Sequence, residues 1–156
     1  MKNLLNLLVF SCLAVGLSAK VVRPNVVFLV SEDNSIHYLR LYGNELGKTP
    51  AIEKLAAEGL TFNHAFSNAP VCSVARSTLA TGILAPRVGI QYHRKTATAN
   101  LPKGLKPWSG ILRDNGYFCT NIRKTDYNFV ANIKELWDKP GGKNSPWGGR
   151  KDDKTP

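Results

Sequence analysis

Runs of apolar residues along the chain follow two spacings, one typical of buried strands and one typical of amphipathic helices. A continuous, largely β-branched run over residues 26–30 predicts a strand buried on both faces, and the alternating stretch 60–66 predicts a second strand. Between them, apolar residues at helical spacing begin after Thr49 and Pro50 and end at Gly59. This segment predicts an amphipathic helix that joins the two strands.

Three further elements are predicted downstream. Residues 72–81 predict a short helix that stops at Gly82, and residues 107–115 predict a helix that stops at Gly116. Residues 117–122 predict a third strand. Strands that alternate with helices favour an α/β fold with a mixed, mostly parallel sheet flanked by helices. Because three strands are too few for such a sheet, we expect the fold to be incomplete at its C-terminus.

The two ends of the chain differ in composition from its middle. Residues 1–19 have a positive start, an apolar centre and a small residue at their end, which predicts a signal peptide and export to the periplasm or the extracellular space. Lipoprotein anchoring at Cys12 is the weaker alternative, because Phe10 is large for such a processing site. No later apolar run is long enough to form a transmembrane segment. Residues 139–156 are rich in Gly, Pro, Lys and Asp, which indicates a loop or a truncated tail.

The composition suits one globular domain, but the charge is unusual. The 156 residues are 43% hydrophobic and carry a net charge of +10. This charge fits either attraction to a polyanion, such as a sulfated polysaccharide, or the loss of an acidic remainder of a longer chain. No basic and aromatic motif of a nucleic-acid module is present, so we expect no nucleic-acid partner. After export Cys72 and Cys119 remain, and a disulfide between them is the alternative to separate roles.

Charged side chains gather where the predicted strands end. Glu32 and Asp33 follow the first strand, and Lys124 and Asp126 follow the third. Packed carboxylate oxygens suit Ca²⁺ or Mg²⁺, whereas a solvated turn or a helix cap is the simpler alternative. The polar segment that contains His93 suits an anionic substrate, and as an isolated segment it also fits a solvated face.

The predicted helix 72–81 begins with a cysteine and carries an arginine one turn later. Cys72 is expected to lie in the positive field of the first helix amides, which can also hold an anion, and Arg76 adds a cation there. A buried structural cysteine is the alternative for this position.

Together these segments resemble the N-terminal part of the sulfatase family, within the alkaline-phosphatase-like superfamily. The resemblance runs from about residue 23 to residue 126 and looks closest to the branch of heparan N-sulfatase and bacterial polysaccharide sulfatases. It implies that residues 20–138 are the N-terminal part of a sulfatase catalytic domain. Its most specific element is the run Cys72-x-x-x-Arg76-x-x-Leu79-x-Thr81-Gly82.

The resemblance implies a sulfuric ester or sulfamate hydrolase that acts on a sulfated carbohydrate. Cys72 is expected to be oxidised to formylglycine by a formylglycine-generating enzyme or an anaerobic sulfatase-maturating enzyme, and the hydrate of this aldehyde attacks the sulfate sulfur. Glu32, Asp33 and the modified residue 72 are the implied ligands of Ca²⁺ or Mg²⁺. With residue 72, Arg76 and Lys124 are the implied catalytic residues, because Arg76 supports the formylglycine and Lys124 contacts the sulfate.

The chain departs from the family pattern at several positions. Glu32 stands where the family usually has Asp, and Val74-Ala75 replaces the usual Pro-Ser in the segment that the maturing enzyme reads. Asp126 stands where the family has a histidine, so His93 is expected to supply that contact, and both are candidate substrate-binding residues. The other metal ligands of the family lie downstream of this stretch, so we expect no stable activity from these 156 residues alone.

Two other functions fit parts of the pattern. The first is a phosphohydrolase of the same superfamily, although the spacing from Cys72 to Arg76 is that of sulfatases. The second is a non-catalytic, truncated protein that binds sulfated glycans through its basic surface, in a salt-sensitive manner.

Overall fold

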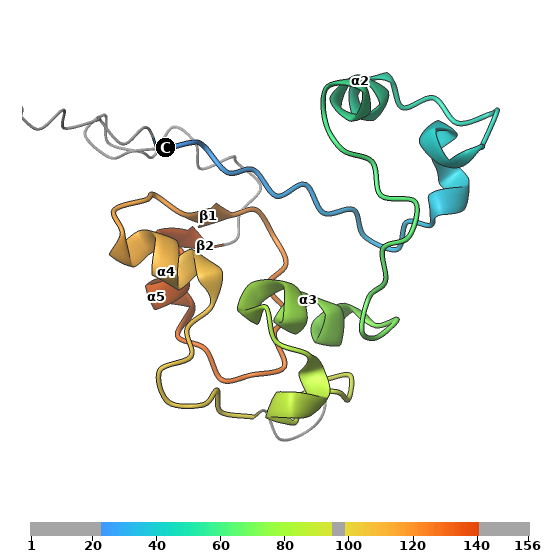
Figure 1. Ribbon diagram of the computed structural model, residues 1–156. Coiled ribbons are helices and arrows are strands. Elements are labelled where there is room, and N and C mark those ends of the chain that lie inside the picture. Colours follow the sequence, from blue (N-terminus) through green and yellow to red (C-terminus); the bar gives the residue numbers. More distant parts are fainter. Residues whose placement is uncertain (1–22, 95–98, 141–156) are drawn as a thin grey trace, which may run out of the picture.

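The structure is a computed structural model that describes residues 23–94 and 99–140 (Figure 1). Within these residues one sheet is formed, a parallel pair of two short strands. The elements in chain order are the short 3-10 helices η1 (Ile36–Tyr38) and η2 (Arg40–Tyr42), the helices α2 (Pro50–Glu58) and α3 (Cys72–Thr81), the 3-10 helix η3 (Ala85–Val88), the helix α4 (Trp108–Asp114), the strand β1 (Thr120–Asn121), the helix α5 (Ile133–Leu136) and the strand β2 (Lys139–Pro140).

The three longer helices lie where the sequence predicts them. At the end of α3, Gly82 adopts a left-handed conformation with φ of 70°, and its N–H donates to the carbonyl of Thr78 at 2.8 Å. Gly116 has φ of 86° just after α4. At the start of α2, Glu53 accepts from both the N–H and the hydroxyl of Thr49, each at 3.2 Å. Local signals therefore mark the start of α2 and the ends of α3 and α4.

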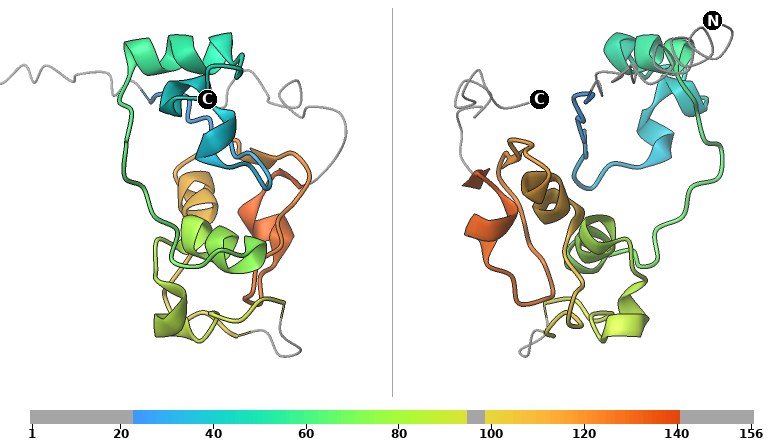
Figure 2. Two further views of the ribbon diagram at one scale, coloured as in Figure 1. Left: turned by 90° about the vertical axis from the view of Figure 1, so that its right-hand side faces the viewer. Right: turned by 60° about the vertical axis from the view of Figure 1, so that its left-hand side comes forward.

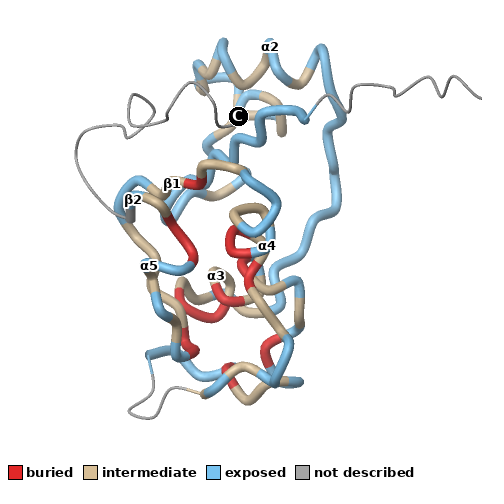
Figure 3. The backbone as a smooth tube through the Cα atoms, turned by 90° about the vertical axis from the view of Figure 1, so that its left-hand side faces the viewer, coloured by how far each residue is buried: buried red, intermediate tan, exposed pale blue. Residues whose placement is uncertain are grey.

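The buried residues form two clusters that share partly buried neighbours (Figure 3). One cluster joins α3 and η3 to the loop around residue 129, and the other joins α4 and α5 to β1. The first consists of Val74, Ala80, Ala85, Ile90 and Phe129, and the second consists of Cys119, Leu136 and Trp137. The first cluster includes Val74 of α3, and the second packs α4 and α5 beside β1, so the two clusters fix these elements relative to one another.

Aromatic stacking attaches the extended N-terminal segment to the part of the protein that contains these two clusters, which is called the body below. The ring of Phe28 stacks on Trp108 of α4 with a centroid distance of 5.3 Å, and Trp108 meets Trp137 edge to face at 5.7 Å. Each such pair contributes roughly 0.5–1.5 kcal/mol beyond burial of its area. The segment that precedes Glu32 is therefore held against α4.

The predicted strands differ most from the structure. Residues 26–30 are extended but pair with no strand among the described residues, and their apolar side chains are between 48% and 80% exposed. Residues 60–66 also form no strand. A strand buried on both faces needs neighbours on each side, and no described segment supplies them. The prediction of strands at these two places is therefore wrong for the described structure.

The third predicted strand is shorter than expected, and the tail contributes to a sheet. Of residues 117–122 only Thr120 and Asn121 pair, in parallel with Lys139 and Pro140. The predicted loop over residues 139–156 therefore begins with β2 rather than with irregular structure, and residues 141–156 lie outside the described residues.

Helix α2 and its neighbours form an outlying lobe beside this body (Figure 2). No residue of α2 is buried, and Leu55 on its predicted apolar face is 64% exposed. The predicted signal peptide 1–19 and Cys12 lie outside the described residues. None of the helices within the described ranges is long and apolar enough to cross a membrane.

Candidate active site

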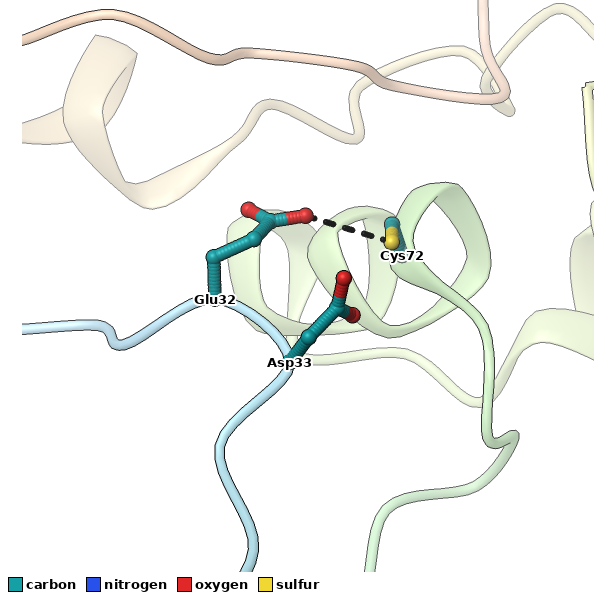
Figure 4. A group of neighbouring side chains, drawn as sticks. All are labelled: Glu32, Asp33 and Cys72. Atoms are coloured by element: carbon teal, nitrogen blue, oxygen red, sulfur yellow. Dashed lines mark hydrogen bonds between the residues drawn. The ribbon is translucent and has the colours of Figure 1, made fainter.

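Cys72 is the first residue of α3 and faces the acidic loop that follows the N-terminal segment (Figure 4). Its thiol donates to Oε1 of Glu32 at 3.4 Å, across 40 residues of sequence. Ligand atoms of Glu32, Asp33 and Cys72 all lie within 4.8 Å of one another. The structure thus brings together the three residues that the sequence predicts as metal ligands.

Two cations pair with the carboxylate of Glu32. Arg76 donates through Nη2 to Oε2 at 2.8 Å, and Lys124 donates through Nζ to Oε1. The hydrogen bonds from Lys124, Arg76 and the Cys72 thiol, in that order, lower the pKa of Glu32 from 4.5 to about 2. The same ion pair raises the pKa of Lys124. Glu32 is therefore an anion over the whole physiological range.

Arg76 also connects α3 to the loop after β1. It lies one turn after Cys72 on the helix, so both side chains project from the same face. Its Nη1 donates to the carbonyl of Lys124 at 2.9 Å, and the amide of Asn121 donates to the same oxygen at 3.3 Å. The guanidinium thus fixes both the backbone of Lys124 and the carboxylate of Glu32.

Asp126 is held by a two-point ion pair with Arg94. Nε of Arg94 donates to Oδ1 at 3.0 Å and Nη2 donates to Oδ2 at 2.8 Å. These bonds lower the pKa of Asp126 and raise that of Arg94. Nζ of Lys124 lies 3.6 Å from Oδ2 of Asp126. Lys124 therefore stands between the carboxylates of Glu32 and Asp126.

His93 reaches the start of α3 through a serine. Its Nδ1 lies 2.9 Å from Oγ of Ser73, the residue that follows Cys72. All seven residues that the sequence predicts for the site are thus carried by the loop around residue 32, by α3 and by the loops around residues 93 and 125. The imidazole of His93 is anchored through Ser73, whereas the hydrogen bond of the Cys72 thiol goes to Glu32.

A buried polar network beneath the site was not predicted from the sequence. Ser77 donates to the carbonyl of Ser73 at 2.6 Å and accepts from the N–H of Asn128 at 2.8 Å. The amide of Asn128 donates to the carbonyls of Ile90 and Tyr92, and its oxygen accepts from the N–H of Arg94 at 3.2 Å. Two serines four residues apart on one helix face were the available sequence signal. This network fixes the loop that carries His93 and Arg94.

Left-handed backbone conformations gather at the same place. Among the described residues, the non-glycine residues with positive φ are Asp33 (49°), Arg94 (43°), Arg123 (84°) and Asp126 (51°). Three of them are residues of the site and the fourth precedes Lys124. Such conformations cost of order 1 kcal/mol each and persist where surrounding contacts hold them, often at functional sites.

The two described cysteines are unpaired and differ in environment. Cys72 is half-buried, whereas Cys119 is 7% exposed within the second core cluster. Burial, followed by the charge of Asp138, raises the pKa of Cys119 to about 11. The alternative of a disulfide between Cys72 and Cys119 is not realised in this structure.

The donor set at the start of α3 suits a hard divalent cation once residue 72 offers oxygen. Glu32 and Asp33 supply carboxylate oxygens, which Ca²⁺ and Mg²⁺ prefer. The thiol of Cys72 is a soft donor that these ions do not favour. The positions of these side chains therefore fit such an ion. With an oxygen-bearing side chain at position 72, all three ligand atoms would be oxygen.

Comparisons with known proteins show the family of the chain. The family model described as Sulfatase matches residues 24–151. The ulvan-active sulfatase of Formosa agariphila is 34% identical over 145 residues, covering 84% of this chain and 23% of the relative. N-acetylgalactosamine-6-sulfatase of Canis lupus familiaris is 36% identical over 132 residues, covering 84% and 24%.

A third relative, the uncharacterized sulfatase YidJ of Escherichia coli, is 39% identical over 121 residues and covers 74% of this chain and 24% of its own length. The chain thus spans about a quarter of the length of these curated relatives. No solved structure matches it significantly. The family match covers most of the residues, including the whole candidate site, and the chain belongs to the sulfatase family.

Proposed function

We propose that the protein hydrolyses sulfate esters, or sulfamates, of a sulfated carbohydrate, with formylglycine formed at Cys72 and a divalent cation beside it. The observation that carries this proposal is the approach of Glu32, Asp33 and Cys72 to within 4.8 Å of one another, although the acids and the cysteine come from separate segments. The family match and relatives named for ulvan and for N-acetylgalactosamine-6-sulfate support the substrate class.

Glu32, Asp33 and residue 72 are the proposed ligands of this cation, for which Ca²⁺ is the first choice and Mg²⁺ the second. When bound, the ion supplies positive charge that favours deprotonation of the nucleophile and offsets charge on the sulfate oxygens. Formylglycine supplies the nucleophile as its hydrate, whose second hydroxyl allows sulfate to be eliminated afterwards. The oxygen of this side chain removes the mismatch between a thiol and a hard cation.

Arg76 and Lys124 are the proposed cations for the sulfate group. Both now donate to Glu32, and both retain further N–H groups for oxygens of a substrate. The first amides of α3 add donors at the same place, because the first turn of a helix leaves its N–H groups unpaired. Negative charge that develops on the sulfuryl oxygens is thus met by fixed donors.

His93 is the proposed second contact for the substrate, in the role that a histidine near Lys124 has in the family. Its link to Ser73 holds the imidazole near the start of α3. A protonated imidazole donates through both nitrogens, so one N–H remains for a sulfate oxygen or the leaving oxygen when the other meets Ser73. The carboxylate of Asp126 accepts hydrogen bonds and cannot donate one to a sulfate. It therefore acts on the substrate through Arg94 and Lys124.

The sequence-based expectations for the whole protein remain part of this proposal. We infer export through residues 1–19 and maturation by a formylglycine-generating or anaerobic sulfatase-maturating enzyme. We also infer that residues 20–138 are the N-terminal part of a catalytic domain. The mixed, mostly parallel sheet flanked by helices is also proposed for the fold as a whole. The exposed apolar side chains of residues 26–30 support it, because further elements packed on them would remove them from water.

The test compares sulfate and phosphate esters of the same aryl alcohol as substrates of the protein made from its complete gene together with a maturing enzyme. We expect Ca²⁺-dependent release of sulfate, and much slower release of phosphate. Cys72→Ala is the matched variant, because it retains the fold and removes the nucleophile. Faster phosphate release would identify the phosphohydrolase alternative, and salt-sensitive glycan binding without turnover would identify the non-catalytic binder.

A further inference from the structure

The ion pair of Arg94 and Asp126 has an uneven burial that orients the arginine outward. The side chain of Asp126 is 17% exposed and that of Arg94 is 54% exposed. Two parallel hydrogen bonds join them, at 3.0 and 2.8 Å, which fixes the plane of the guanidinium. The less exposed carboxylate of Asp126 therefore holds the guanidinium of Arg94 in a fixed position at the surface.

The backbone of Arg94 is fixed as firmly as its side chain. Its N–H donates to Oγ of Ser73 at 3.3 Å and to Oδ1 of Asn128 at 3.2 Å. Ser73 and Asn128 are buried, and Ser73 adjoins Cys72. Arg94 and Asp126 both have positive φ, which these contacts maintain against a steric cost. An arginine whose only role was to be an exposed polar residue would not need these backbone contacts.

Arg94 lies at the outer end of a row of alternating charges that begins at the candidate metal ligands. Glu32 pairs with Lys124, Lys124 approaches Asp126 at 3.6 Å, and Asp126 pairs with Arg94. Arg94 is also close enough to Glu32 and Cys72 to interact electrostatically with both. The row thus leads from the proposed site of sulfate attack to a second cation at its edge.

We propose that Arg94 binds a second anionic group of the substrate, a carboxylate or a further sulfate, next to the sulfate that is hydrolysed. This inference rests on the proposed function and names its substrate class more closely, as a carbohydrate with at least two anionic groups. Nη1 of Arg94 has no partner among the described residues, so its N–H groups are free to meet an oxyanion. Asp126 is then a positioning residue, since a carboxylate repels the anion that Arg94 attracts.

The inference is tested by the binding of three sugars to the protein made from its complete gene. Calorimetry in Ca²⁺ at fixed ionic strength measures the affinities, so the test does not depend on hydrolysis. The probes are glucose monosulfate, glucose disulfate and glucuronate monosulfate. We expect one or both of the last two to bind about tenfold more tightly than glucose monosulfate, the gain of one charge-assisted contact. Preference for the disulfate identifies a second sulfate, and preference for the glucuronate identifies a carboxylate.

Variants separate this contact from general attraction to a basic protein. Arg94→Gln should bring the affinity ratio close to one, Arg94→Lys should retain part of it, and Asp126→Asn should reduce it by releasing the guanidinium. Arg87→Gln removes an equal charge at an exposed position on η3 and should leave the ratio unchanged. A two-dimensional NMR spectrum of each variant reports whether the fold is retained.

Three results overturn the inference, and each identifies a different error. If the wild type binds glucose monosulfate but shows no preference for either second anion, Arg94 is not the proposed contact while the proposed function stands. If the ratio persists in Arg94→Gln, another group makes the contact. Absence of binding to every sugar sulfate contradicts the proposed function itself, and the inference falls with it.

Discussion

Lys124 donates from its ammonium group to the carboxylate of Glu32, across 92 residues of sequence. The pair joins the loop after β1 to the acidic loop near the N-terminus, and Arg76 of α3 donates to the same carboxylate. A candidate ligand of a divalent cation is thus occupied by two cations of the protein itself. Any metal that binds Glu32 has to compete with them.

This competition predicts an unusual effect of a lysine substitution on metal affinity. Lys124→Met should raise the affinity for Ca²⁺ several-fold at low salt, because it removes a positive charge from the site and frees Oε1 of Glu32. Calorimetric titration with Ca²⁺ measures the change. Lys103→Met, at an exposed lysine with no ion pair in the described structure, is the control and should match the wild type. Equal or weaker Ca²⁺ binding by Lys124→Met contradicts the prediction.

The same ion pairs predict the titration of Glu32 in metal-free protein. Its pKa of about 2 in the folded state lies below the ordinary value of 4.5. Its pairing therefore stabilises the fold fully above pH 4.5, and that contribution is lost as the pH falls towards 2. Carboxyl-carbon NMR should show a midpoint near 2 in the wild type and a higher one in Lys124→Met. A wild-type midpoint at the ordinary value would falsify this account of the ion pairs.

The buried network around Asn128 predicts a large loss of stability on its removal. Asn128→Ala removes the donor to the carbonyls of Ile90 and Tyr92 and leaves the N–H of Arg94 with only its longer bond to Ser73. The free energy of unfolding should fall by about 3 kcal/mol, as measured by urea denaturation. Asn63→Ala, at an exposed position, should change it by less than about 0.5 kcal/mol. A loss of under about 1 kcal/mol for Asn128→Ala shows that the network is not held as described.

The two described cysteines should react at very different rates. Burial and a pKa of about 11 keep Cys119 a neutral thiol at pH 8, and a neutral thiol is a poor nucleophile. Iodoacetamide should therefore label the half-buried Cys72 first in unmatured protein, and Cys119 only after unfolding. Mass spectrometry of the peptides measures both. A cross-linked peptide that contains Cys72 and Cys119 would instead support the disulfide alternative.

Helices were predictable because their signals are local. Pro50 at the first position of α2 and the glycines Gly82 and Gly116 after α3 and α4 lie within a turn of the boundaries that they set. Strands depend on partners that sequence pattern alone does not supply, and the run 26–30 has the composition of a central strand but no neighbour in the described structure.

The candidate site was likewise predictable from local sequence only in part. The spacing of Cys72 and Arg76 on one helix is a local pattern, whereas the approach of Glu32 and Lys124 to them followed from resemblance to the sulfatase family. Ser73 and Asn128 were missed because their hydrogen bonds join loops distant in sequence, and serine and asparagine are common at exposed positions too. The bidentate contact of Arg94 with Asp126 was likewise visible only in the structure.

The proposed function requires formylglycine at residue 72, and the chemical state of this residue can be measured directly. Trypsin cleavage after Lys54 and Arg76 releases a peptide that contains Cys72, whose mass distinguishes a thiol from an aldehyde. In protein produced with a maturing enzyme, we expect the aldehyde, trapped by a hydrazide reagent. The double variant Val74→Pro, Ala75→Ser restores the usual family pair and shows that the maturing enzyme is active. A thiol retained in the wild type while this variant is converted would show that residue 72 is not formylglycine in this protein.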